Sequence, residues 1–169
     1  MPFVVETERL TLRRLTIDDS AFILELLNDP AFLRFVGDKG VRTIEEARQY
    51  LIDGPLASYD QLGFGLYLVV LNSTQQPIGM CGLIKREALD DVDIGFAFLP
   101  EFRRRGYAFE AAAAVKDYAI NVLGLGRLLA ITNQDNAGSI KVLEKIGLKF
   151  DKLIRLAPET DEIRLYRTE

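Results

Sequence analysis

The spacing of apolar residues along the chain changes between a period of two and a period of three to four, which predicts strands and helices in turn. In the segment Glu8–Leu15, leucine alternates with arginine and threonine, as in a strand with one buried face. From Thr16 the apolar residues recur at helical spacing until Asn28, where Asn-Asp-Pro ends the pattern. We expect strands at residues 8–15, 64–71, 78–85, 91–99, 127–133, 148–154 and 162–167, helices at 16–28, 43–52, 109–123 and 136–147, and an irregular segment at 31–42.

The order of these elements restricts how the strands can pair. The three strands between residues 64 and 99 follow one another through short connections, which fits an antiparallel meander. The strand ending at Leu99, the helix 109–123 and the strand 127–133 form a strand–helix–strand unit, whose two strands should be parallel neighbours with a right-handed crossover. We therefore expect one domain over residues 1–169, of mixed α/β (α+β) class, with a mostly antiparallel central sheet and about four helices.

The strongest chemical signal lies between the strand ending at Leu99 and the helix that follows it. This connection reads Arg103-Arg-Arg-Gly-Tyr-Ala108. A turn in this position directs backbone N–H groups toward one point, and the helix adds the positive end of its dipole. Gly106 lets the backbone approach a ligand closely. The segment predicts a phosphate site, and the alternative is a basic turn whose arginines are simply solvated.

The composition argues against several other kinds of site. The chain has no histidine and one cysteine, Cys81, within an apolar stretch, so we expect no metal site, no Ser-His-Asp triad and no Cys-His dyad. The net charge of −4 disfavours nucleic acid as a partner. No run of about 18 apolar residues is present, so no membrane partner is expected. We expect a cytoplasmic protein with a buried, inert thiol.

These motifs, in this order of elements, resemble the GNAT superfamily of acyl-CoA-dependent N-acetyltransferases. Arg103–Ala108 fits the pyrophosphate pattern of that family, which is Gln or Arg, two residues, Gly, one residue, then Gly or Ala. Asn136 with Ser139 fits the helix whose asparagine lies along the pantetheine arm. Thr7–Arg13 and Asp93-Ile-Gly-Phe look most like the RimJ/RimL branch, which acetylates the N-termini of ribosomal proteins. Many relatives in that branch act on other amines.

The resemblance implies a GNAT-like sheet that splays between the strand ending at Leu99 and the strand ending at Asn133, with acetyl-CoA as cosubstrate. A backbone N–H near Phe98 or Leu99 would stabilise the oxyanion of the attacked thioester. Arg104, Arg105 and Lys141 are the side chains that could reach the 3′-phosphate. The implied cofactor contacts are Phe98, Leu99, Arg103, Arg104, Arg105, Gly106, Tyr107, Ala108, Phe109, Asn136 and Ser139.

The resemblance also implies direct transfer of the acetyl group to a primary amine in a ternary complex. The substrate ammonium must first lose a proton, and without histidine the base must be a carboxylate. Asp93 stands where the family often has glutamate, and a structural role is the alternative. The family's usual tyrosine acid is replaced by Leu143, so Ser139 is the candidate to bond the sulfur, unless its hydroxyl only caps the helix. The catalytic candidates are Asp93, Ser139 and the backbone of Leu99.

No sequence motif identifies the amine acceptor. Its pocket should lie between the segment 28–42 and the strand pair around 155–162, and the acceptor could be a protein N-terminus or a small amine. A CoA-binding module without turnover is compatible with Leu143 and with a structural Asp93. Anion binding through the arginine turn alone is a third reading. The protein could be a monomer or a homodimer.

Overall fold

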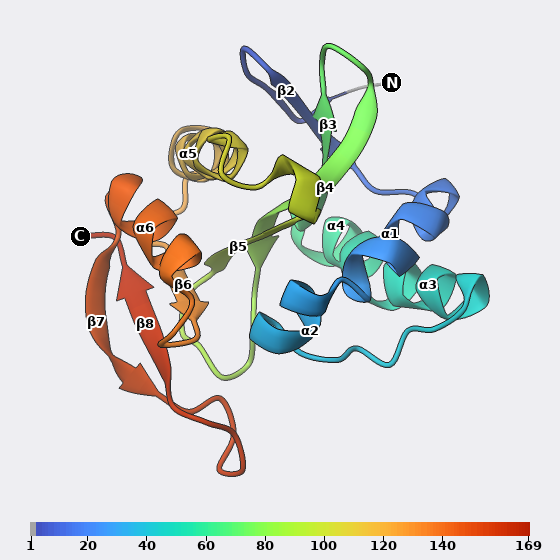
Figure 1. Cartoon of the computed structure of the whole chain (residues 1–169). Helices are drawn as coiled ribbons and strands as arrows, with labels where there is room; N and C mark the ends of the chain where they lie inside the picture. Colours follow the sequence, from blue (N-terminus) through green and yellow to red (C-terminus); the bar gives the residue numbers. More distant parts are fainter. Residues whose placement is uncertain (1–2) are drawn as a thin grey trace.

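One eight-stranded mixed sheet runs through the computed structural model, which describes residues 3–169 (Figure 1). The strands are β1 (Val5–Glu6), β2 (Leu10–Arg14), β3 (Leu66–Leu71), β4 (Gln76–Ile84), β5 (Asp93–Phe98), β6 (Leu129–Thr132), β7 (Lys149–Ile154) and β8 (Ile163–Arg167). The helices are α1 (Ser20–Leu27), α2 (Pro30–Phe35), α3 (Ile44–Leu51), α4 (Ala57–Leu62), α5 (Tyr107–Asn121) and α6 (Ala137–Lys145). The expected fold class is confirmed.

The sheet consists of two antiparallel parts joined by one parallel pair. Its strand order is β1-β2-β3-β4-β5-β6-β8-β7, and only β5 and β6 run parallel. These two strands pair at a single position, Asp93 with Leu129, next to a hydrogen bond from the Leu129 N–H to the Val92 carbonyl (2.9 Å). Beyond this point they separate. The expected meander, the parallel neighbours and the splay between them are all confirmed.

Apolar residues from both faces of the sheet form the main core. Helices α1 to α4 lie together on one side of the central strands, and α5 lies on the other side against β4 and β5 (Figure 1). Cys81 on β4 is fully buried, and burial raises the pKa of its thiol, as expected for an inert cysteine. The layers leave the splayed edge of β5 open to a ligand.

Two short helices were not predicted from the sequence. The segment 31–42 was expected to be irregular, but α2 occupies its first part, with Pro30 in its first turn and the Asp29 carboxylate accepting from the Phe32 N–H (3.2 Å). The helix expected to end near Ile52 continues through a wide helical turn (Ile52–Leu56) into α4. A turn with i→i+5 bonding tolerates Pro55, which lacks an N–H.

Candidate functional site

The connection between β5 and α5 has the backbone geometry of an anion site. Arg104 (φ 62°) and Gly106 (φ 83°) both adopt left-handed conformations, and Gly106 is the N-cap of α5. Within residues 3–169, the N–H groups from Arg104 to Phe109 donate to no acceptor. A non-glycine residue in this conformation costs about 1–2 kcal/mol, and such strain gathers at functional sites. Unpaired donors at the start of a 15-residue helix bind phosphate groups well.

The arginine side chains of this loop differ in what they contact. Arg103 donates from Nε to the Phe98 carbonyl (3.0 Å) and from a terminal nitrogen to the Asp29 carboxylate (2.5 Å). It therefore ties the loop to the end of β5 and to the start of α2. Arg104 and Arg105 are exposed. The structure thus gives Arg103 a supporting contact, while the loop backbone stays available to a ligand.

Two residues far from the loop in sequence, Thr7 and Arg9, hold it in place, largely through Glu110 of α5. Arg9 pairs with Glu110 of α5 (Nε to Oε1, 2.7 Å) and donates to the Arg105 carbonyl (3.0 Å). Its guanidinium also lies 4.4 Å from the centre of the Tyr107 ring. Glu110 further accepts from the Thr7 hydroxyl (2.5 Å) and from the Arg9 N–H (3.0 Å). Burial raises the pKa of Glu110, but these hydrogen bonds together outweigh it and hold that pKa below its ordinary value.

The edge of β5 corrects one expectation about the oxyanion donor. The N–H of Leu99 donates to the Ile78 carbonyl (3.0 Å), so it is not free to bind a thioester. Hydrogen-bonding direction alternates along an antiparallel pair, so Phe98 and Phe96 direct their N–H groups away from β4, toward the splay. Phe96 lines the large cavity described next. The Phe96 N–H is not predicted as a donor from the sequence, because its direction depends on the register between β4 and β5.

A cavity of about 920 Å³ opens at the splay between β5 and β6. Its wall includes Asp93 and Phe96 from β5, Thr132 from β6, and Ser139 from α6. Both segments expected to form an acceptor pocket line it as well, with residues 32–39 on one side and 156–161 on the other. The sequence did not predict that Tyr50 of α3 and Arg86 of the β4–β5 connection also lie in this wall. One cavity therefore joins the splay to both expected acceptor walls.

Asp93 lies at the point where β5 and β6 meet, with only 1% of its surface exposed. Arg86 donates from Nε to both carboxylate oxygens (3.2 and 3.4 Å). Burial raises the pKa of Asp93 to about 6, and the Arg86 charge opposes this rise. Such a carboxylate is ionised at neutral pH and is still more basic than an exposed aspartate. It can accept a proton near neutral pH.

The start of α6 places two further candidates in the cavity wall. The Asn136 Oδ1 caps the helix by accepting from the Ser139 N–H (3.3 Å). The Ser139 hydroxyl has no partner among the described residues, so the helix cap is supplied by Asn136 and not by Ser139. Both residues line the cavity, and so does Leu143, which is 2% exposed and carries no acidic group.

Comparisons with known proteins define the class. Residues 9–149 match the model of the GNAT acetyltransferase domain. YkkB of Bacillus subtilis (strain 168) is 30% identical over 152 residues, which cover 88% of this chain and 87% of YkkB. The uncharacterized N-acetyltransferase YoaA of the same organism is 28% identical over 153 residues, covering 90% and 86%. The chain belongs to the GNAT acetyltransferase family, and it is an acyltransferase that uses acetyl-CoA.

Solved structures agree with this assignment. The acetyltransferase from Agrobacterium tumefaciens str. C58 has a TM-score of 0.81 and 29% identity, over 100% of this chain and 95% of that chain. RimL, the ribosomal L7/L12 alpha-N-protein acetyltransferase solved with coenzyme A, has a TM-score of 0.84 over 98% of this chain and 97% of RimL. At 15% identity this second likeness shows the fold alone. Within residues 3–169, no helix combines the length and apolar character needed to span a membrane.

Proposed function

We propose that the protein transfers the acetyl group of acetyl-CoA directly to a primary amine, with both substrates bound at the same time. The observation that carries this proposal is the single cavity in which a buried carboxylate, a free serine hydroxyl and the splayed edge of β5 meet. A direct transfer needs the amine and the thioester side by side, and the cavity offers room for both. The amine is that of a protein N-terminus or of a small molecule.

The chain's residues suit acetyl-CoA in a definite orientation. The unpaired N–H groups from Arg104 to Phe109 would hold the pyrophosphate, and Gly106 lets that backbone approach closely. The pantetheine arm would follow the splay past Asn136 to the edge of β5. There the Phe96 and Phe98 N–H groups would donate to the pantetheine amide and to the thioester carbonyl. A donor at the carbonyl stabilises the oxyanion that forms during attack.

Asp93 and Ser139 act at the two ends of the reaction, on the amine and on the sulfur. Asp93 takes a proton from the substrate ammonium, directly or through water, and the freed nitrogen lone pair forms the new bond to the carbonyl carbon. The carbon–sulfur bond then breaks, the electron pair leaves on the sulfur, and the nitrogen gives up its second proton to water, which leaves a neutral amide. The Ser139 hydroxyl donates a hydrogen bond to this thiolate, which can depart without a stronger acid because the thiol pKa is about 8.5.

The test is thiol release from acetyl-CoA with a panel of amines. The panel should contain peptides with free N-termini, lysine peptides with blocked N-termini, spermidine and small amines, because a RimL and a spermidine N-acetyltransferase are both among the structural neighbours. We expect amine-dependent release and an acetylated product by mass spectrometry. Saturable acetyl-CoA binding without release for any amine would instead identify a CoA-binding module without turnover.

Asp93→Asn is the variant that tests the assigned base. It should lower the rate at least about a hundredfold, the usual contribution of general base catalysis. Asp91→Asn is a matched control, because Asp91 lies two residues away and pairs with Arg127 (3.3 Å) on a partly exposed surface. Equal rates in the two variants would contradict the role of Asp93.

A further inference from the structure

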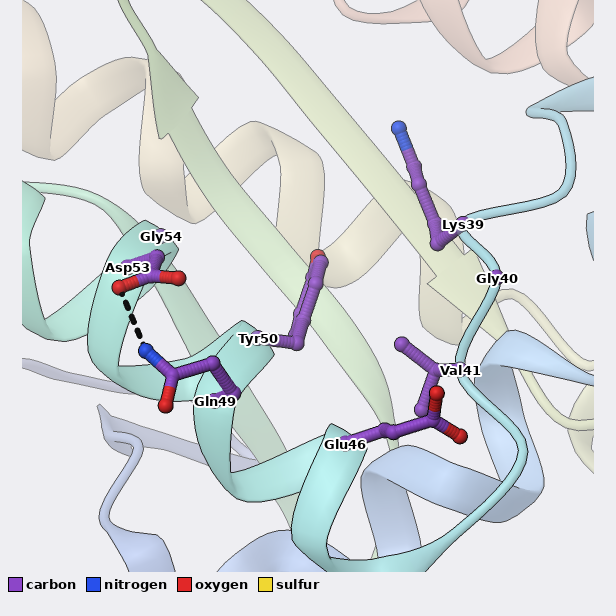
Figure 2. A pocket seen from close by; sticks show the side chains of 8 residues that line it. All are labelled: Lys39, Gly40, Val41, Glu46, Gln49, Tyr50, Asp53 and Gly54. Carbon is purple, nitrogen blue, oxygen red and sulfur yellow. Dashed lines mark hydrogen bonds between the residues drawn. The ribbon is translucent and has the colours of Figure 1, made fainter.

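One end of the large cavity gathers cationic and hydroxyl donors around Arg86, which pairs with Asp93. Lys39, Tyr50 and Arg86 all line it, from the loop after α2, from α3 and from the β4–β5 connection. A smaller adjoining cavity of about 430 Å³ also has Lys39 and Tyr50 in its wall. Figure 2 shows the Lys39 ammonium and the Tyr50 hydroxyl directed to the same side of this smaller cavity. Three segments distant in sequence therefore place donors around one space.

These donors have little to bond within the protein. Among the described residues, the Lys39 ammonium and the Tyr50 hydroxyl make no hydrogen bond or ion pair. Within residues 3–169, Arg86 uses only Nε, toward Asp93, and leaves both terminal nitrogens without an acceptor. Lys39 is exposed at the cavity mouth, but partial desolvation and the neighbouring Arg86 charge lower its pKa. Two cations close together favour a bound anion that would offset their repulsion.

Nearby carboxylates are already engaged elsewhere. Asp38, next to Lys39 in sequence, pairs with Arg42 (2.6 Å). Asp53, which lines both cavities, accepts from the Gln49 amide (2.9 Å; Figure 2). Glu46, in the wall of the smaller cavity, accepts from the Arg42 N–H (3.0 Å). Within residues 3–169, none of these three carboxylates pairs with Lys39. An acidic group from outside the protein would meet free donors at this end.

We propose that Lys39, Tyr50 and the terminal nitrogens of Arg86 form a subsite for an anionic group, a carboxylate or a phosphate, carried by the amine acceptor. The inference rests on the proposed function and specifies its acceptor. Arg86 touches both this subsite and Asp93, so the anionic group lies only a few bonds from the reacting nitrogen. Charged hydrogen bonds of this kind orient a small substrate strongly.

Two acidic residues from a further segment also belong to the wall of this cavity. Glu159 and Asp161, on the connection between β7 and β8, line the cavity. A substrate with one amine and one anionic group therefore finds groups of opposite charge for each of its ends in the same cavity wall. A polyamine would place a second cation against Lys39 and Arg86, which is unfavourable. Acceptors with a single amine and an anionic group are the class selected.

The test compares amines that differ only in the anionic group. The pairs are glycine with glycinamide, β-alanine with β-alaninamide, and O-phosphoethanolamine with ethanolamine, with spermidine as a further acceptor. Rates are compared at equal concentrations of the neutral amine, because the amide changes the amine pKa. We expect kcat/KM to be at least about tenfold higher for the anionic member, and the carboxylate and phosphate arms identify which anion is preferred.

Variants connect the preference to the subsite. Lys39→Gln and Tyr50→Phe should each reduce the ratio of anionic to amide turnover about three- to tenfold, because each removes one donor. Lys152→Gln on β7 is the matched control, since Lys152 is exposed and does not line the cavity. It should keep the wild-type ratio. A ratio near one in the wild type, or the same ratio in all variants, would overturn the inference while leaving acetyl transfer in place.

A binding measurement separates the subsite from catalysis. Calorimetry with CoA present should show N-acetyl-β-alanine binding more tightly than N-acetyl-β-alaninamide, and Lys39→Gln should remove most of the difference. This result would stand even if no amine were turned over. Failure of thiol release with every amine contradicts the proposed function, whereas equal binding of the two products contradicts the subsite.

Discussion

The contact of Arg9 with Glu110 gives a quantitative prediction about acetyl-CoA binding. In Arg9→Met the apolar stem of the side chain is kept, but the guanidinium is lost. The variant removes the 2.7 Å ion pair with Glu110, the 3.0 Å hydrogen bond to the Arg105 carbonyl and the cation–π contact with Tyr107. The loop that carries the unpaired N–H groups then loses its direct hydrogen bond from the β1–β2 turn, and only the bonds from Thr7 and the Arg9 N–H to Glu110 remain.

The expected size of the effect follows from these contacts. Hydrogen bonds to charged groups are worth about 1.5–3 kcal/mol and exposed cation–π contacts about 0.5–1 kcal/mol. The Arg9 side chain is 41% exposed, so solvent screening reduces these values, and a total of about 1–2 kcal/mol is reasonable. If acetyl-CoA binding must then provide the free energy that orders the loop, the KM for acetyl-CoA rises about tenfold. The effect should fall on KM more than on kcat.

Arg13→Met is the control for a simple loss of stability. Arg13 forms two hydrogen bonds with Asp19 (2.9 and 3.0 Å), and its side chain is only 18% exposed, so its loss should destabilise the fold at least as much. This pair lies on β2 and the turn before α1, away from the loop. Steady-state kinetics and thermal unfolding should be measured for both variants. An unchanged acetyl-CoA KM in Arg9→Met, with both proteins folded, would refute the reasoning.

Three further predictions concern the loop and the catalytic groups. Gly106→Ala and Gly124→Ala both force alanine into a left-handed conformation (φ 83° and 72°), at about 1–2 kcal/mol each, but only Gly106→Ala should raise the KM for acetyl-CoA. Asp93 must be ionised to accept a proton, and its pKa is about 6, so kcat/KM should fall as the pH drops through about 6. In Asp93→Asn this decrease near pH 6 should be absent. If kcat/KM instead follows only the pKa of the amine, in the wild type and in the variant alike, Asp93 is not the base. Ser139→Ala should lower kcat about tenfold, measured by stopped-flow detection of thiol release. An unchanged rate would show that the hydroxyl does not contact the sulfur.

Local sequence signals predicted most of the fold. Apolar spacing located every strand from β2 onward, and the expected helix starts at Thr16, Thr43 and Asn136 are confirmed, each of these residues being an N-cap. The short helices α2 and α4 are not predicted because the expected helices 16–28 and 43–52 end just before Pro30 and Gly54-Pro55. Pro30 instead begins α2, and Pro55 is accommodated in a wide turn. Proline alone does not distinguish a helix start from a helix end.

The site was predictable only where one segment carries it. The loop Arg103–Ala108 is contiguous, so its glycine and its position before a helix could be interpreted from sequence. The engagement of the Leu99 N–H depends on the register with Ile78, and the contacts of Arg103 depend on Asp29, 74 residues away. The grouping of Lys39 with Arg86 likewise arises from packing. Side chains that meet only in three dimensions leave no periodic signal.

An amide-resolved NMR titration tests the phosphate-binding loop most directly. The labelled protein would be titrated with CoA and, separately, with pantetheine, which lacks the pyrophosphate. We expect CoA to shift the amide protons from Arg104 to Phe109 downfield, as new hydrogen bonds form, and pantetheine to leave them in place. Saturable CoA binding that leaves these amides unchanged would contradict the assignment of the loop.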